Sequence, residues 1–103
     1  MKIRLIVPNE YREANGTHDT NLVPYQGAIA NIAGGFTASQ ATGGWKDDSG
    51  NLIVEPVTVF DCFVVPDGEI CGRFENLAKR IARELHQDCV YLEIDGLVQF
   101  VKP

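Results

Sequence analysis

The sequence predicts one small α+β domain of the ferredoxin-like kind, a βαββαβ sandwich with an antiparallel sheet and a small C-terminal hairpin. Three observations lead to this prediction. The chain has 103 residues, the usual size of a single domain, so residues 1–103 are expected to fold as one unit. Hydrophobic residues make up 45% and charged residues 22%, as in folded globular proteins. Apolar side chains recur in the order strand, helix, strand, strand, helix, strand.

The first strand is expected over residues 2–7. Its apolar side chains Ile3, Leu5 and Val7 alternate with Lys2 and Arg4, which gives the strand one clearly apolar face. The polar residues 10–19 follow and are interpreted as a loop, because they include a glycine and show no apolar period.

A short helix comes next. Thr20 or Asn21 can cap it, and Pro24 suits its first turn, where no hydrogen-bonding N–H is lost. The Gly34-Gly35 pair ends it, since glycine readily adopts the left-handed conformation at a helix C-terminus. Four apolar residues recur at helical spacing: Leu22, Tyr25, Ile29 and Ile32.

Two β-prone stretches, residues 36–45 and 52–65, are joined by turn residues 47–51 and are expected to form a hairpin. The second stretch is apolar on both faces. Even positions carry Leu52, Val54, Phe60, Cys62 and Val64, and odd positions carry Ile53, Val57, Val59, Phe63 and Val65. A strand that is wet on one side alternates polar with apolar residues, so both faces of this strand should be covered. Helices cover one face, and we expect another copy of the chain to cover the second.

The second helix is expected from Asp67, its N-cap, to Leu85. Its apolar stripe is continuous and consists of Ile70, Phe74, Leu77, Ala78, Ile81, Ala82 and Leu85. A strand over residues 89–94 follows. Asp95-Gly96 then turns the chain into residues 97–101, as a hairpin partner or a kinked continuation.

Charge and composition exclude several classes of function. The net charge of −5 argues against nucleic acid as a partner, because nucleic-acid binding requires a basic surface. The cluster Lys79, Arg80 and Arg83 alternates with Glu75 and Glu84, which is typical of a solvated helix face. No apolar run is long enough to cross a membrane, and the N-terminus does not resemble a signal peptide.

The cysteines and histidines predict neither a disulfide framework nor a metal centre. Cys62, Cys71 and Cys89 form no CxxC pair and are expected to be buried and reduced, which predicts a cytoplasmic protein. His18 and His86 are far apart and have no second ligand at metal spacing, so no metal and no cofactor are expected.

Candidate binding residues are acidic and aromatic. Glu55 interrupts an apolar strand beside Pro56, and Glu93 shares a strand face with Tyr91. Asp61 has the same parity as Glu55 and is a weaker candidate. These carboxylates can simply stay solvated near strand ends. On an apolar face covered by a subunit they would be costly unless they bind something, and acids beside Trp45 or Tyr91 would suit a cationic ligand.

Three segments together resemble the phage-encoded S-adenosylmethionine lyases, formerly called hydrolases. The segments are Thr42-Gly43-Gly44-Trp45-Lys46-Asp47, Glu55-Pro56-Val57-Thr58-Val59 and Ala82-Arg83-Glu84-Leu85-His86-Gln87-Asp88-Cys89-Val90-Tyr91. They occur in the family's order and approximate spacing, over the last two thirds of the chain. Residues 36–59 are also similar to a bacterial domain family of unknown function with the same Gly-x-Trp, glycine-turn and Glu-Pro features.

The lyase resemblance implies a ferredoxin-like trimer with active sites between subunits, and cleavage of S-adenosylmethionine into 5′-methylthioadenosine and homoserine lactone. It implies Glu55 as the residue that holds the sulfonium or the substrate amine. Face parity adds Glu93 as the second catalytic candidate. The substrate-binding candidates are Trp45, Tyr91, Gly43 and Gly44. Two alternatives stay open. One is a non-catalytic oligomer that binds a host partner through its acidic surface, and the other is a small isomerase-like enzyme with Glu93 as base.

Overall fold

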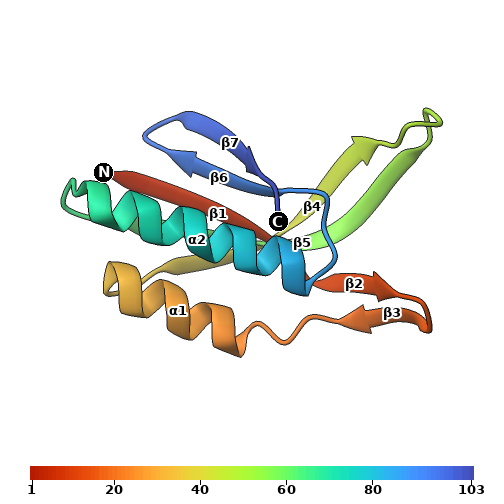
Figure 1. Ribbon diagram of the computed structural model, residues 1–103, viewed down its shortest axis with the longest axis horizontal. Helices are drawn as coiled ribbons and strands as arrows, with labels where there is room; N and C mark the ends of the chain where they lie inside the picture. Colours follow the sequence, from red (N-terminus) through yellow and green to blue (C-terminus); the bar gives the residue numbers. More distant parts are fainter.

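The computed structural model describes residues 1–103 as seven strands and two helices. In chain order these are β1 (Lys2–Pro8), β2 (Glu10–Glu13), β3 (Gly16–Asp19), α1 (Val23–Ala33), β4 (Thr37–Lys46), β5 (Leu52–Phe63), α2 (Gly68–Glu84), β6 (Val90–Ile94) and β7 (Leu97–Val101). Five strands form one antiparallel sheet in the order β4-β5-β1-β6-β7, while β2 and β3 form a separate hairpin. Both helices lie on the same side of the sheet (Figure 1).

This arrangement is compatible with a ferredoxin-like fold. The first strand, β1, lies between β5 and β6, so each helix connects two strands that are not neighbours in the sheet. The antiparallel sheet and the two-helix layer are as expected. The terminal hairpin forms in full: β6 pairs with β7 through a turn in which Asp95 has φ 49° and Gly96 has φ 84°. Positive φ at both central residues is the conformation that Asp-Gly turns favour.

The core lies between the helices and the sheet. Ile3, Leu5 and Val7 of β1 are at most 1% exposed, and so is Ile29 of α1. The predicted stripe of α2 packs against them, with Phe74, Leu77, Ala78, Ile81, Ala82 and Leu85 all buried. Asp67 caps α2 as expected, since its carboxylate accepts a hydrogen bond from the N–H of Glu69 at 2.9 Å. Removal of this cap would cost about 1 kcal/mol.

The start of α1 differs slightly from the prediction. The N-cap is Leu22, which makes no side-chain capping bond. The Asn21 side chain instead accepts a hydrogen bond from the N–H of Val23 at 3.2 Å, from one position outside the cap. Pro24 sits in the first turn, and Gly34 ends the helix with φ 85°, both as predicted.

The prediction of a loop over residues 10–19 is wrong. These residues form the β2–β3 hairpin, in which Glu10 pairs with Asp19 and Tyr11 with His18. Their sequence has no alternating apolar pattern because little of the hairpin is buried. Cross-strand pairs hold it instead, and the Tyr11 ring lies between the rings of His18 and His86, at 5.6 and 6.2 Å.

The expectation that all three cysteines are buried is also wrong. Cys62 is buried in β5, but Cys71 is half-buried and Cys89 is exposed. Cys89 lies in the connection between α2 and β6, one residue before the strand begins at Val90. All three are free thiols. Neither helix has the length and apolar character needed to cross a lipid bilayer.

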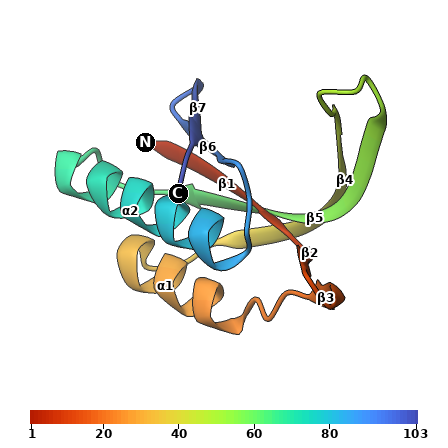
Figure 2. The ribbon, with the colours of Figure 1, turned by 45° about the vertical axis from the view of Figure 1, so that its right-hand side comes forward.

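The β4–β5 hairpin is the longest feature of the sheet and is strongly bent. Its far half turns away from the helix layer, so that the sheet is concave on the side without helices (Figure 2). The predicted turn residues close the hairpin: Asp47 accepts hydrogen bonds from the N–H groups of Ser49 and Asn51, each at 2.9 Å, and Gly50 has φ 82°.

Candidate interface site on the open sheet face

We call the side of the five-stranded sheet that carries no helix the open face. Ile3 and Leu5 point into the core, so Arg4 between them lies on the open face. Directly opposite residues of neighbouring strands share a face. Arg4 pairs with Asp61 on β5 and with Glu93 on β6, which therefore also lie on the open face.

The same parity places most of the predicted site residues on this face. Glu55 is six positions from Asp61 on β5 and pairs with Gly43, and Trp45 follows Gly43 two positions later. Tyr91 is two positions from Glu93 on β6. Gly44 is the exception: it pairs with Val54 and lies on the opposite face, so the structure does not bring it to the others.

The open-face residues form two separate groups within one chain. The hairpin group consists of Gly43, Trp45 and Glu55, and the central group of Arg4, Asp61, Tyr91 and Glu93. Glu55 and Asp61 are six residues apart, which corresponds to about 20 Å along a strand. Glu55 and Glu93 therefore do not meet in a single chain, and a site that used both groups would need a second subunit.

The central group is tied together by short polar contacts. The Arg4 guanidinium donates two hydrogen bonds to the Asp61 carboxylate, at 2.8 and 3.1 Å. This pairing lowers the pKa of Asp61 and raises the pKa of Arg4. The Tyr91 hydroxyl donates a 2.6 Å hydrogen bond to Glu93, which raises the pKa of Tyr91. Arg4 was not among the predicted site residues. Its position opposite two acids depends on strand pairing, which the sequence does not show.

Glu55 has a different environment. It is half-buried and makes no ion pair or hydrogen bond within the chain. Its pKa is raised, first by burial and second by the nearby charge of Glu10. Glu10 comes close because the N–H of Asn9 donates to the carbonyl of Pro56 at 3.0 Å, which holds the β1–β2 corner against β5. A carboxylate destabilised in this way would gain from a bound cation.

Large apolar side chains are exposed on the open face. On the open face, Phe63 is 76% exposed, Phe100 66%, and Trp45 and Val98 46% each. This apolar exposure fits the expectation of a covered second face. One residue behaves differently from that expectation: Val57 is already buried within the chain, at 6% exposure. Its Cγ1 lies 3.2 Å from the point that a Cβ on Gly43 would occupy, so it fills the space that this glycine leaves.

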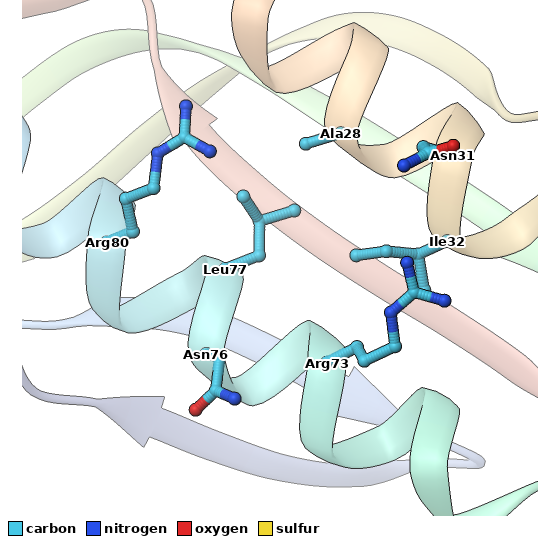
Figure 3. A pocket seen from close by; sticks show the side chains of 7 residues that line it. All are labelled: Ala28, Asn31, Ile32, Arg73, Asn76, Leu77 and Arg80. Carbon is cyan, nitrogen blue, oxygen red and sulfur yellow. The ribbon is translucent and has the colours of Figure 1, made fainter.

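Two hollows of a single chain lie elsewhere. One, of about 560 Å³, is lined by Arg12, Glu13, Ala14 and His86 beside the β2–β3 turn. Another, of about 330 Å³, is a groove between α1 and α2 on the helix layer (Figure 3). Neither contains a predicted site residue. No group of three or more His, Cys, Asp and Glu side chains is placed to hold a metal ion.

Comparison with known proteins gives a match in three dimensions. No protein-family model matches the chain, and no curated protein matches it in sequence. A solved structure of a phage SAM lyase in complex with S-methyl-5′-thioadenosine matches with a TM-score of 0.70 and 20% identity, over 95% of this chain and 83% of that chain. The chain has the fold of the phage SAM lyases.

A second solved structure, a phage SAM lyase in the apo state, matches with a TM-score of 0.67 and 19% identity, over 95% of this chain and 82% of that chain. The resemblance predicted from three short segments is confirmed at the level of the fold. The common SAM lyase fold also extends beyond those segments. They covered the last two thirds of the chain, whereas the structural match covers almost all of it.

Proposed function

We propose that the protein is a lyase that cleaves S-adenosylmethionine into 5′-methylthioadenosine and homoserine lactone, at sites formed on the open face between the subunits of a homotrimer. One observation carries the proposal. A phage SAM lyase was solved with S-methyl-5′-thioadenosine, which is the nucleoside product of this reaction, and its fold matches 95% of the present chain. The acidic and aromatic residues on one sheet face add support from the chain itself.

The reaction is an internal displacement. An oxygen of the substrate's carboxylate bonds to the γ-carbon of the methionyl chain, and the bond from that carbon to sulfur breaks. Its electron pair stays on sulfur, which becomes the neutral thioether of methylthioadenosine. The lactone keeps the ammonium group. Nucleophile and leaving group belong to one molecule, so the protein has to hold the folded, near-attack conformer.

The change in charge explains why a covered apolar face would suit this chemistry. A negative carboxylate and a positive sulfonium neutralise each other as the bond forms, so water stabilises the substrate more than the transition state. A dry pocket therefore accelerates the reaction, and the step transfers no proton and needs no general base, metal or cofactor.

Glu55 is the proposed cation-binding residue. Its carboxylate is half-buried, faces another acid and has no positive partner in the chain. A sulfonium or ammonium group placed beside it would relieve this unfavourable environment. Gly43 pairs with Glu55 on the open face, and Trp45 supplies an exposed ring for the adenosine. Gly44, on the opposite face, has no part in the proposed site.

Glu93 and Tyr91 are the proposed contribution of a second subunit. Within one chain they lie in the central group, well separated from Glu55 along the sheet. When the open faces of two copies meet, the central group of one copy can approach the hairpin group of the other. The exposed Phe63, Val98 and Phe100 would then be buried, at about 25 cal/mol for each Å² of apolar surface removed from water.

The direct experiment mixes purified protein with S-adenosylmethionine and follows methylthioadenosine by chromatography. Wild type is expected to form the product and Glu55→Gln to lose most of the activity, because the amide has no charge to offer the substrate. Glu69→Gln, on the exposed start of α2, is the matched control and should behave as wild type. No product from the wild-type protein, or an equal rate in Glu55→Gln, contradicts the proposal.

A non-catalytic oligomer that binds a host partner is the second candidate. The observation that favours it is that neither of the two hollows described above is lined by Glu55 or Glu93. Thermal unfolding separates the two candidates. A ligand at 100 times its dissociation constant stabilises a protein by about 2.7 kcal/mol, so methylthioadenosine should raise the melting temperature of an enzyme and leave that of a non-catalytic binder unchanged.

A further inference from the structure

The groove between α1 and α2 has a feature that the proposed reaction does not use. Its floor is apolar, formed by Ala28 and Ile32 of α1 and Leu77 of α2. Arg73 and Arg80 stand at its two ends, and both guanidinium groups point toward α1 (Figure 3). The groove lies on the helix layer, so it is separated from the open face by the whole thickness of the domain.

The two arginines differ in their partners. Arg80 is held in place: its Nε lies 3.2 Å from Glu84, and its guanidinium lies 5.5 Å from the centre of the Tyr25 ring. The Tyr25 hydroxyl also donates to Glu84, at 2.9 Å, so Glu84 compensates this end of the groove. Arg73 is exposed and makes no ion pair, although Glu69 lies one turn before it on α2.

Arg73 has no acidic partner on the opposite wall of the groove. Acidic residues outnumber basic ones by 14 to 9, yet α1, the opposite wall of the groove, carries no charged residue at all. Asn31 of α1 adds an amide at the same end as Arg73 (Figure 3). The end of the groove near Arg73 therefore offers positive charge and hydrogen-bond donors directly beside an apolar floor.

We propose that this groove is a docking site for an acidic peptide segment of a partner protein. A carboxylate of the segment would pair with Arg73, and a branched apolar side chain would pack on Leu77 and Ile32. Arg73 and Leu77 are at i and i+4 on α2, so the two anchors of the partner would lie about 6 Å apart. An acidic residue and a leucine one helical turn apart on a partner helix meet this spacing, in the helix-in-groove mode of recognition.

The apolar floor favours a peptide over a small free anion. Inorganic phosphate could pair with Arg73 but would leave Leu77, Ile32 and Ala28 as they are. A peptide anchor uses both parts of the site, and binding hot spots are enriched in arginine and lie in well-packed pockets from which water is excluded.

The test uses the full chain and two short, capped helical peptides as probes. One peptide presents Glu and Leu at i and i+4, and in the other Gln replaces Glu. Amide chemical shifts are expected to change at Asn31, Ile32, Arg73 and Leu77 and to leave the open face unaffected. The Gln peptide is expected to bind about tenfold more weakly, because one charge-assisted hydrogen bond is lost. Inorganic phosphate alone should not change the amide chemical shift of Leu77.

Matched variants make the test specific. Arg73→Gln should remove the preference for the Glu peptide, whereas Arg83→Gln, the same change on the exposed end of α2 outside the groove, should keep it. Equal binding of the two peptides, no shift in the groove, phosphate shifts equal to those of the peptide, or equal effects of the two substitutions would each overturn the proposal. Methylthioadenosine formation should be unchanged in Arg73→Gln, so this result does not depend on the proposed lyase activity.

Discussion

The Tyr91 hydroxyl donates a 2.6 Å hydrogen bond to the carboxylate of Glu93, two residues along the same strand face. The Tyr91 ring also contacts Phe100 edge-on, with ring centres 6.0 Å apart. The apolar contact therefore orients the ring, and the hydroxyl orients the carboxylate. If Glu93 contacts substrate, Tyr91 fixes where its charge is held.

Tyr91→Phe separates these two roles. The ring and its contact with Phe100 remain, so the melting temperature should change little. Glu93 loses its donor, and methylthioadenosine formation should fall roughly tenfold, the usual effect of one lost hydrogen bond to a charged group. Steady-state kinetics and a thermal melt on the same sample check this. A variant with the wild-type rate would show that the hydrogen bond does not matter for catalysis.

Glu55→Gln is expected to stabilise the protein while it removes activity. The folded-state pKa of Glu55 is raised above its ordinary value of 4.5, so its contribution to stability is full below that value and is lost as pH rises through the folded pKa. The glutamine has no charge to lose. Its melting temperature should exceed that of wild type at pH 7, and the gain should shrink as the pH falls below 4.5. A gain that is independent of pH would contradict this account.

Gly43 and Gly44 form a matched pair for testing close packing in the hairpin. A Cβ at Gly43 would lie 3.2 Å from the Cγ1 of the buried Val57, whereas a Cβ at Gly44 would meet nothing closer than 3.7 Å. Gly43→Ala should therefore be less stable than Gly44→Ala by about 1 kcal/mol, measured by denaturant unfolding. Adding Val57→Ala to each variant is the control. It should reduce the difference between the two glycine substitutions, because it removes the Cγ1 that the new Cβ would meet.

The exposed apolar side chains of the open face should control the oligomeric state. Phe100→Lys puts a charge where a partner copy is proposed to lie, and it should convert the oligomer to monomer at micromolar concentration, as measured by sedimentation. Val23→Lys is the control, since Val23 is 69% exposed against 66% for Phe100 but lies at the start of α1. A wild-type protein that is already monomeric would remove the basis for a site shared between subunits.

Tyr25 should be the most resistant tyrosine to alkaline titration. Burial and its hydrogen bond to Glu84 raise its pKa from 10.0 to about 12. The raised value means that the contribution of Tyr25 to stability is full below pH 10 and is lost as pH rises toward 12. Tyrosinate absorbance of the wild type should show a last step near pH 12 that Tyr25→Phe lacks. If that step persists in Tyr25→Phe, the assignment is wrong.

Much of the fold could be predicted because local patterns specify it. The stripe of α2, the cap at Asp67, the glycine at Gly34 and the Asp95-Gly96 turn each depend on residues within one or two turns of the chain. The β2–β3 hairpin could not be predicted in this way. Its ordering depends on Tyr11 meeting His86, which lies 75 residues away.

Apart from the β2–β3 hairpin, the sequence by itself determined the order of strands and helices. It also determined the parity of each strand, because side chains alternate with a period of two. It therefore indicated correctly that Glu93 and Tyr91 share one face. Only the tertiary structure decided which strands are neighbours, and with that the pairing of Arg4 with Asp61 and Glu93 and the wide separation of Glu55 from Glu93. Strand neighbours are chosen by packing and hydrogen bonds between distant segments, and no local pattern records that choice.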